Sequence, residues 1–426
     1  MDVTHWAEHA IFWQVYPLGF TGAPPAAEPG TDPVPRLRRI AGWFDHLIAL
    51  GANGLLLGPV FASETHGYDT VDHYRVDPRL GTEDDLRWLV DTAHSRGIRV
   101  VLDGVFNHVG RGFPQLSDVD TAHWFRRDAD GELATFEGHH RLVALDHAQP
   151  AVADYVAGVM DHWLDAGIDG WRLDAAYAVP TAFWRTVSDR VHGAHPDAWL
   201  LGEMIHGDYA ELVTVGGLDS VTQYELWKAI WSGLSDLNFY ELAHALERHE
   251  RWLDTFVPQT FLGNHDVTRI ASQVPDPRHL AHAVVVLMTV AGIPSIYAGD
   301  EEGFTGVKEE REGGDDAVRP PFPDTPEELS DLGAPVLALY QELVALRRRH
   351  PWLVRARTRV EQLDNRQLVY RSTGAAGEAL LVALNLDDAD LVAAVPGEWQ
   401  VEAGPGGFHG SKVRTGGHGW VVLAPR

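Results

Sequence analysis

Three acidic residues each follow a short apolar segment. They are Asp174 in "GWRLDAA", Glu203 in "LLGEM" and Asp266 in "FLGNHD". Carboxyl groups that meet in a pocket can cleave a glycosidic bond, because one attacks the anomeric carbon or activates water and a second protonates the leaving oxygen. A neighbouring carboxylate raises the pKa of the acid and keeps it protonated near neutral pH. The pattern therefore predicts glycosidic bond cleavage if the three segments lie side by side.

A cation precedes the first of these acids by two residues. Side chains alternate along a strand, so Arg172 and Asp174 share one face. Taken alone, the pair is explained better by a buried structural salt bridge, and isolated acids at strand ends are explained by helix capping. Taken with Glu203 and Asp266, the pair predicts a nucleophile, Asp174, and a cation that keeps it ionised.

Eight short apolar segments alternate with helical patterns and must position these side chains. The segments are residues 10–20, 53–60, 98–108, 167–176, 198–205, 218–224, 256–266 and 292–301. Apolar residues at helical spacing occur at 35–50, 82–97, 150–166, 180–195, 225–249, 278–291 and 333–349. The alternation predicts an α/β fold, and eight units predict a (β/α)8 TIM barrel with its site at the carboxyl ends of the strands. An open doubly wound sheet is the alternative, but no G-x-G-x-x-G follows the first segment.

Two parts of the chain do not fit a bare barrel. The connection over 109–149 is long and rich in His, Asp and Gly, and loops of this length are usually functional. From about residue 355 the chain changes to short predicted strands, such as "RQLVYRS" and "GWVVLAP". We therefore expect a catalytic barrel over 1–108 and 150–354, a short inserted domain over 109–149 and a C-terminal β-sandwich domain over 355–426.

Composition disfavours several classes of function. The chain has 426 residues, no cysteine and a net charge of −27, which disfavours nucleic acid and anionic membranes as partners and excludes disulfides and thiolate metal sites. No apolar run approaches the roughly 18 residues of a membrane span, and the first residues lack a signal-peptide pattern. These features predict a cytoplasmic protein. A metal-dependent hydrolase is a rival, but "FWQVYP" has no His pair and no H-E-x-x-H occurs, so no metal ligand and no cofactor is predicted.

At these residues the sequence resembles the α-amylase family, family 13 of the glycoside hydrolases. The resemblance covers about residues 10–350. It rests on six segments in the family's order: "QVYP" (14–17), "GYDTVDHY" (67–74), "DGVFNH" (103–108), "GWRLDAA" (170–176), "LLGEM" (200–204) and "FLGNHD" (261–266).

The resemblance implies a role for each residue of the motifs. Asp174 would be the nucleophile that forms a covalent glucosyl-enzyme, Glu203 the general acid/base, and Asp266 the carboxylate that orients sugar hydroxyls and stabilises the transition state. Five further residues would bind the substrate or support the site. Arg172 would position and ionise Asp174, and Asp103 would brace the site. His108 and His265 would bind sugar hydroxyls, and Tyr68 would stack on the sugar. Asp315 and Arg319 resemble a donor-side pair, although a solvated charge run explains them equally. Residues 109–149 would be a shortened B domain.

Two segments, "FNHVGRGFP" (106–114) and "FWRTVSDRV" (183–191), resemble the neopullulanase and cyclomaltodextrinase branch. That branch carries an N-terminal β domain that often builds its dimer, whereas the first strand here is predicted near residue 10, so we expect a monomer or a weak homo-oligomer.

Tyr177 and Ala178 stand where many α-amylases have Lys-His, which grips leaving-side sugars. Asn107 matches a calcium ligand of many α-amylases, but a calcium site is not predicted.

The leading hypothesis is a retaining hydrolase of α-1,4 bonds, with α-1,6 bonds as a second linkage, in malto-oligosaccharides or cyclodextrins. The first alternative is a glucosyltransferase or glucoside isomerase that uses the same intermediate with a sugar acceptor. The second is a non-catalytic binding protein on the same barrel, against which the complete set of three carboxylates argues.

Overall fold

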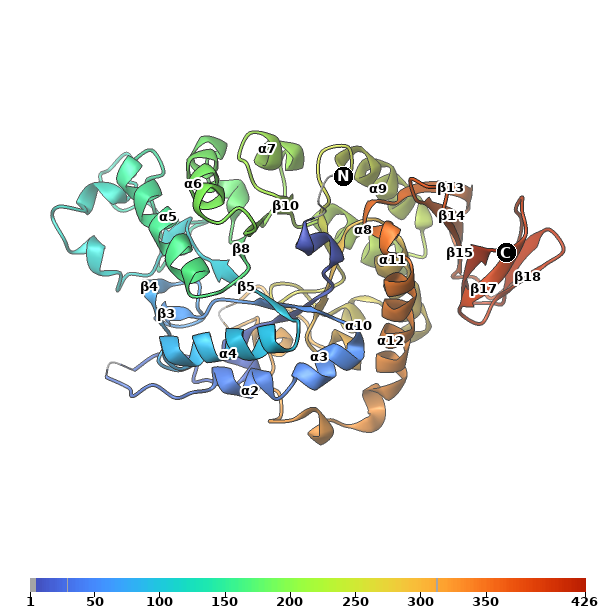
Figure 1. Cartoon of the computed structure of the whole chain (residues 1–426), viewed down its shortest axis with the longest axis horizontal. Coiled ribbons are helices and arrows are strands. Elements are labelled where there is room, and N and C mark those ends of the chain that lie inside the picture. The colour runs from blue at the N-terminus through green and yellow to red at the C-terminus, as the bar shows by residue number, and fades with distance from the viewer. Residues whose placement is uncertain (1–4, 29, 312) are drawn as a thin grey trace.

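A computed structural model describes residues 5–28, 30–311 and 313–426 (Figure 1). Its central sheet has eight strands in the order β10-β9-β8-β5-β2-β1-β12-β11, and a parallel bridge between Thr222 and Gln259 joins the two ends of this order into a ring. The strands are β1 (Phe12–Val15), β2 (Gly54–Leu57), β5 (Arg99–Gly104), β8 (Gly170–Leu173), β9 (Trp199–Gly202), β10 (Ser220–Val221), β11 (Gln259–Phe261) and β12 (Ile293–Tyr297). All are parallel to their neighbours, which confirms the predicted TIM barrel.

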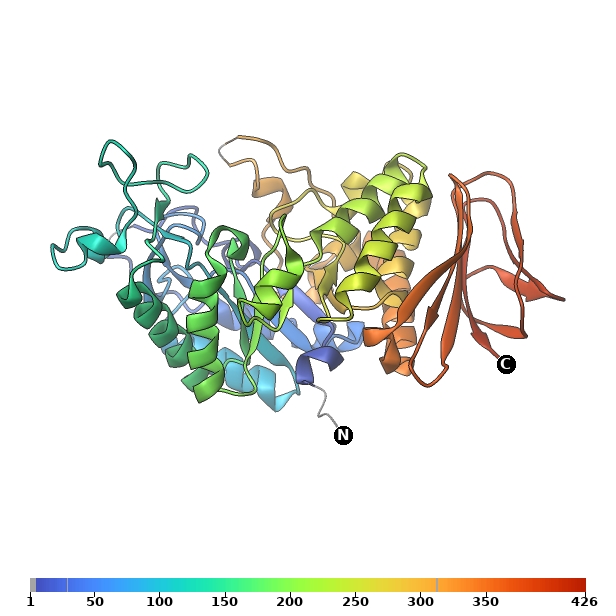
Figure 2. The ribbon, with the colours of Figure 1, turned by 90° about the horizontal axis from the view of Figure 1, so that it is seen from above.

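Helices surround the strands, as Figures 1 and 2 show. They are α1 (Pro17–Phe20), α2 (Leu37–Ala41), α3 (Phe44–Leu50), α4 (Glu83–Ser95), α5 (Pro150–Asp165), α6 (Thr181–Ala194), α7 (Tyr209–Thr214), α8 (Tyr224–Ser235), α9 (Phe239–Trp252), α10 (Ile270–Gln273), α11 (Leu280–Thr289) and α12 (Ala334–Arg349). Thr82 caps α4 through a capping box with Asp85. The helix predicted over 225–249 is two helices, because Leu237 adopts a positive φ of 52° and Asn238 caps a new helix, α9.

The strand residues divide between two cores. Trp171 and Leu173 of β8 belong to the core formed with the surrounding helices. Val101 of β5 and Leu201 of β9 belong to a smaller core inside the barrel. Arg172 is in register with Leu201, and parallel neighbours in register point to the same face. Arg172 therefore faces the barrel interior, as the alternation predicted.

Two excursions leave the barrel on the side of the carboxyl strand ends. The first is a hairpin of β3 (Phe61–Ser63) and β4 (Thr70–Val76). The second runs from β6 (His108–Val109) to β7 (Val143–Ala144), which pair with each other. In Figure 2 this second excursion projects on the same side of the molecule as the segment near residues 303–320.

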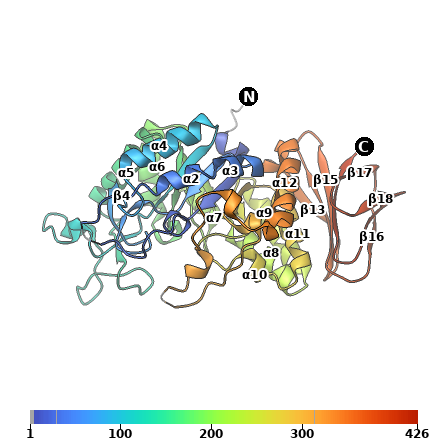
Figure 3. The ribbon, with the colours of Figure 1, turned by 90° about the horizontal axis from the view of Figure 1, so that it is seen from below.

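The last part of the chain is all β, as predicted. Its strands are β13 (Arg357–Leu363), β14 (Gln367–Thr373), β15 (Ala379–Asn385), β16 (Leu391–Ala394), β17 (Trp399–Ala403), β18 (Gly407–His409), β19 (Lys412–Thr415) and β20 (Trp420–Pro425). They form sheets of five and three strands. Leu381 and Leu423 of the larger sheet pack on the smaller one, and Tyr370 on the opposite face joins the barrel core. The larger sheet thus lies between the barrel and the small sheet (Figures 1 and 3).

Candidate active site

The barrel brings charged residues from neighbouring strands to one rim. Asp103 lies at the end of β5 directly opposite Arg172 of β8. Asp174 follows β8 by one residue, and Glu203 follows β9 by one residue. Because the carboxyl ends of parallel strands meet at one edge, residues far apart in the sequence become neighbours there.

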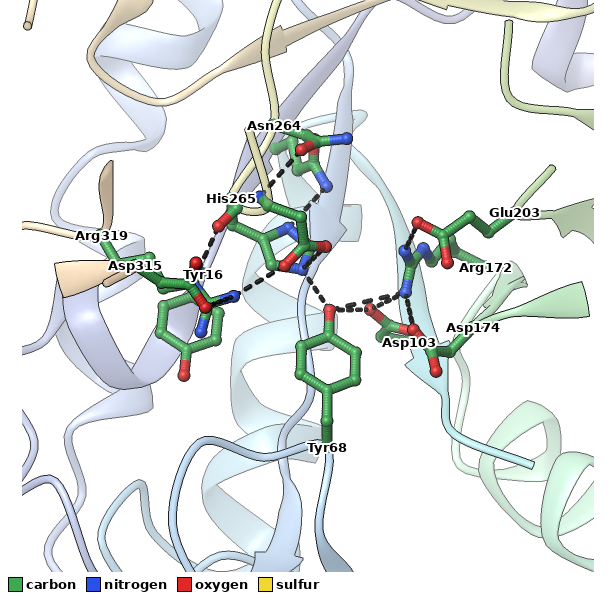
Figure 4. Close-up of polar contacts among 12 residues, drawn as sticks. Tyr16, Tyr68, Asp103, Arg172, Asp174, Glu203, Asn264, His265, Asp315 and Arg319 are labelled. Atoms are coloured by element: carbon green, nitrogen blue, oxygen red, sulfur yellow. Dashed lines mark hydrogen bonds and ion pairs between the residues drawn. The ribbon is translucent and has the colours of Figure 1, made fainter. Parts of the chain in front are cut away.

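Arg172 is the centre of this group (Figure 4). Its Nη1 donates to both oxygens of Asp103, at 2.9 and 2.8 Å, and to Asp174 Oδ1 at 2.9 Å. Its Nη2 lies 2.5 Å from Glu203 Oε1. All four side chains are buried, and Arg172 therefore binds all three carboxylates at once.

A second charged group lies at the end of β11. His265 Nε2 is 3.0 Å from Asp266 Oδ2, and Arg319 Nη2 is 2.7 Å from Asp266 Oδ1. The same Arg319 nitrogen is 3.1 Å from Asp315 Oδ2, and the Arg319 side chain is only 9% exposed. Asp315 and Arg319 therefore belong to the site and are not a solvated charge run.

Tyr68 connects the two groups. Its hydroxyl donates to Asp103 Oδ2 at 3.1 Å and also contacts His265 Nε2. The His265 ring stacks between Tyr16 and Tyr68, with ring centroids 5.6 Å apart in both pairs. Tyr68 is thus held by His265 on its ring and by Asp103 at its hydroxyl.

The surroundings of Asp174 act on its pKa in opposite directions. Burial raises the pKa of Asp174 well above its ordinary value; Arg172 opposes this shift, while Glu203 and Asp103 add to it. One guanidinium cannot neutralise three buried carboxylates, so this group retains a proton in the free protein. Asp266 differs: burial would raise its pKa, but His265 and Arg319 outweigh burial and hold it well below the ordinary value.

His108 lies beside this cluster. Its Nδ1 is 3.1 Å from the Asn107 amide nitrogen, and its ring stacks on Phe136 at 4.9 Å. Burial lowers the pKa of His108 to about 3, so the ring is neutral. The backbone of Tyr68 opposes the effect of burial on the pKa of His108, so His108 lies next to Tyr68 in the site.

Sequence reasoning missed Tyr224, the first residue of α8. Its hydroxyl donates to Glu203 Oε1 at 3.1 Å and accepts from the Asn264 amide at 2.7 Å. Asn264 Oδ1 in turn accepts from the backbone nitrogen of Asp266 at 2.8 Å. A chain of hydrogen bonds therefore joins the two parts of the site, and the only signal for it is that Tyr224 closes the segment "LDSVTQY".

A side chain from the long excursion also reaches the rim. Tyr177 donates to Glu137 Oε1 at 3.0 Å, and its ring lies 4.7 Å from that of His206. Tyr177 is three residues after Asp174 and His206 is three residues after Glu203. These three side chains form a wall beside the two carboxylates, and Tyr177 stands where many α-amylases have the Lys of Lys-His.

Comparisons with known proteins agree with this geometry. A model of the α-amylase catalytic domain matches residues 14–122 and 114–322. A cyclomaltodextrinase of Bacillus sp. is 32% identical over 90% of this chain and 74% of its own length. The intracellular maltogenic amylase of Bacillus subtilis (strain 168) is 30% identical over 71% of this chain and 56% of its own.

The fold has solved counterparts as well. Cyclic α-maltosyl-(1→6)-maltose hydrolase from Arthrobacter globiformis superposes with a TM-score of 0.84 at 25% identity, over 99% of this chain and 100% of that one. The catalytic-domain match, the relatives named as enzymes and the barrel agree with one another. This chain is therefore a glycoside hydrolase, and it belongs to the α-amylase family, as its sequence motifs predicted.

Proposed function

We propose that this protein is a retaining α-glucoside hydrolase of malto-oligosaccharides or cyclodextrins. The observation that supports this most strongly is the binding of Asp174 and Glu203 to different nitrogens of the same guanidinium. This arrangement keeps the two carboxyl groups close together, and retaining enzymes place them about 5 to 5.5 Å apart, whereas inverting enzymes leave room for a water. Asp266 is connected to this group through His265 and Tyr68, whose hydroxyl donates to Asp103, and Figure 4 shows Tyr68 between His265 and Asp103.

The mechanism has two displacements. Asp174 attacks the anomeric carbon while Glu203 gives its proton to the leaving oxygen, which produces a covalent glucosyl-Asp174 ester and a free sugar hydroxyl. Glu203, now a carboxylate, then takes a proton from water as that water attacks the same carbon and releases Asp174. Asp266, held ionised by His265 and Arg319, binds sugar hydroxyls and stabilises the positive charge that develops on the ring. Arg172 and Asp103 hold Asp174 in position, Tyr68 stacks on the sugar, and His108 and His265 bind its hydroxyls.

The proposed linkages and substrates rest on the relatives. The Bacillus sp. relative is named a cyclomaltodextrinase, and the Arthrobacter globiformis structure is a hydrolase of a cyclic maltosyl-(1→6)-maltose. We therefore propose α-1,4 bonds as the main target and α-1,6 bonds as a second one.

Product analysis over a substrate panel tests this proposal. We expect cyclodextrin and maltotriose to be hydrolysed to maltose and glucose faster than starch, with sugars released in the α configuration when followed by NMR. Turnover confined to sucrose or trehalose would contradict the proposed substrates. Initial release of the β anomer would contradict the retaining mechanism.

A sugar acceptor in place of water is the second candidate. The observation that favours it is the wall of Tyr177, Glu137 and His206 beside the catalytic carboxylates, which provides a hydroxyl, a carboxylate and two rings for an acceptor sugar. Chromatography of maltotriose reactions at high substrate concentration separates the two: longer or rearranged sugars as main products indicate transfer, and only shorter sugars indicate hydrolysis.

Tyr224 is expected to support the acid step through Glu203. Tyr224→Phe keeps the ring contacts with Phe261 and Trp227, whose centroids lie at 4.9 and 5.6 Å, and removes only the hydroxyl. Because hydrogen bonds to charged groups contribute about 1.5 to 3 kcal/mol, we expect kcat/KM for maltotriose to fall about tenfold to a hundredfold.

Comparing two substrates with different leaving groups separates a positioning role of Tyr224 from a structural one. An α-glucosyl fluoride needs little proton donation, so its cleavage should fall much less than that of maltotriose in Tyr224→Phe. Equal losses for both substrates would rule the role out. Tyr209→Phe is the matched control, because it also removes a buried tyrosine hydroxyl, from a ring that stacks on Trp252 at 4.5 Å.

The proposal also covers the location of the enzyme, its oligomeric state and its need for a cofactor. No helix in the described ranges is long and apolar enough to cross a membrane, and one relative is named an intracellular enzyme. We propose that the enzyme is cytoplasmic, that it is a monomer or weak homo-oligomer, and that it needs no cofactor. Cell fractionation checks the location, and gel filtration checks the oligomeric state. The Asn107 amide contacts His108, and no calcium site is proposed around it; unchanged activity after EDTA treatment is the expected result.

A further inference from the structure

A group of histidines and aspartates lies between the barrel and the C-terminal sheets. His279 is the last residue of a short 3-10 helix, Pro277–His279, that leads into α11. His418 lies in the turn between β19 and β20. His279 Nε2 and His418 Nδ1 are 2.9 Å apart. Asp276 completes a set in which one ligand atom from each of the three residues lies within 4.8 Å of the others.

A carboxylate at the surface contacts the far side of His418. His418 Nε2 is 2.8 Å from Asp388 Oδ1, so this nitrogen carries the proton and the Nδ1 lone pair points at His279. A histidine that donates one ring nitrogen to a carboxylate and offers the other to a neighbour is the arrangement found around metal ions, where the carboxylate fixes the tautomer and raises the basicity of the ligand.

The two acids beside the rings also face arginines. Asp276 Oδ2 accepts from Arg278 Nη2 at 2.6 Å, and Asp388 lies near both Arg278 and Arg366. Both carboxylate oxygens of Asp276 accept hydrogen bonds from Arg278, so a metal ion would share one oxygen with this arginine or displace it. His279 is 2% exposed and the side chains of Asp276 and His418 are 27% and 14% exposed, so the group is shielded while an opening to solvent remains.

We propose that His279, His418 and Asp276 bind a divalent transition-metal ion, for which zinc is the best match, and that this ion joins the barrel to the C-terminal β domain. Two imidazoles and one carboxylate are ligands that zinc accepts at about 2.0 to 2.2 Å, with water in the fourth position. Tetrahedral zinc separates two such nitrogens by about 3.3 Å, so the nitrogens would move apart by about 0.4 Å. The rings would also turn to direct both lone pairs at the ion, and His279 would carry its proton on Nδ1. The ligands come from both sides of the interface, and binding therefore stabilises the packing of the two domains.

Zinc binding by the full, untagged, EDTA-dialysed chain tests this proposal. Calorimetric titration with ZnCl2 should show one more tight site in the wild type than in His418→Ala. Zinc at about a hundredfold excess over its Kd should raise the melting temperature by about 2 to 4 °C in the wild type only. Asp388→Asn should keep the site with about tenfold weaker affinity. His409→Ala, which removes an exposed histidine from β18 of the same domain, should behave as the wild type.

Equal zinc stoichiometry and affinity in the wild type and His418→Ala would overturn the proposal, because the two rings would then share only a hydrogen bond. If His418→Ala fails to fold, cobalt(II) added to the wild type gives the second readout. The visible absorption of a tetrahedral cobalt complex supports the site, and the spectrum of hydrated cobalt alone overturns it. Neither result depends on the hydrolase proposal, since the catalytic carboxylates lie on other elements.

Discussion

Replacing Glu203 with glutamine is expected to abolish nearly all hydrolysis of maltotriose. Glu203→Gln removes the only proton that the leaving oxygen can receive in the proposed first step and the base that the second step requires. General acid and base catalysis each contribute about 10²- to 10⁴-fold, so kcat/KM should fall by at least about 10³-fold. A rate near that of the wild type would contradict the assignment.

A substrate that needs no acid separates the two roles of Glu203. With α-glucosyl fluoride the first step should persist in Glu203→Gln, and added azide should attack the covalent intermediate without a base. The expected product is α-glucosyl azide, which keeps the configuration of the substrate. Glu225→Gln is the matched control: it removes a carboxylate that lies 2.7 Å from Arg248 at the protein surface, and its activity should equal that of the wild type.

Replacing Asp174 with asparagine is expected to have an even larger effect. Asp174→Asn removes the nucleophile, and a positioned nucleophile corresponds to an effective concentration of about 10⁵ to 10⁸ M. We expect kcat for maltotriose to fall at least about 10⁴-fold. In Asp174→Ala, azide should react directly with α-glucosyl fluoride and give β-glucosyl azide, the opposite configuration from the Glu203→Gln product. Formation of the α product in Asp174→Ala would exclude Asp174 as the nucleophile.

The stability of the Asp174 variant should not fall. Three buried carboxylates share Arg172, and removing one relieves their repulsion, so the melting temperature of Asp174→Asn should equal or exceed that of the wild type. Asp169→Asn is the matched control on the same segment. Asp169 also pairs with an arginine, Arg99, at 2.6 Å, but precedes β8, so its loss should lower the melting temperature and leave kcat nearly unchanged.

The barrel and its rim were predictable because both follow from periodic patterns. Alternation within "GWRLDAA" places Arg172 on the inner face once Trp171 packs outward, and parallel strands bring their carboxyl ends to one edge. The break between α8 and α9 was not predictable, because Leu237 takes a positive φ without the glycine that usually marks such a turn.

The parts of the site that sequence reasoning missed come from elements without such a pattern. Glu137 lies in the long excursion and contacts Tyr177, a pair 40 residues apart that no periodic pattern connects. Tyr224 begins a helix after β10, a strand whose end carries no charged residue. The sharing of Arg172 among three carboxylates was also missed, because the direction of the Asp103 side chain depends on the register of β5 with β8.

The covalent intermediate is the central claim, and trapping it tests that claim most directly. A 5-fluoro-α-glucosyl fluoride forms the intermediate quickly and releases it slowly, since the second fluorine destabilises the oxocarbenium-like transition states while fluoride remains a good leaving group. Intact mass spectrometry should show one fluoroglucosyl group per chain, and peptide mapping should place it on Asp174. A label on another residue, or turnover of this reagent with no label while Asp174→Asn stays active, would contradict the account.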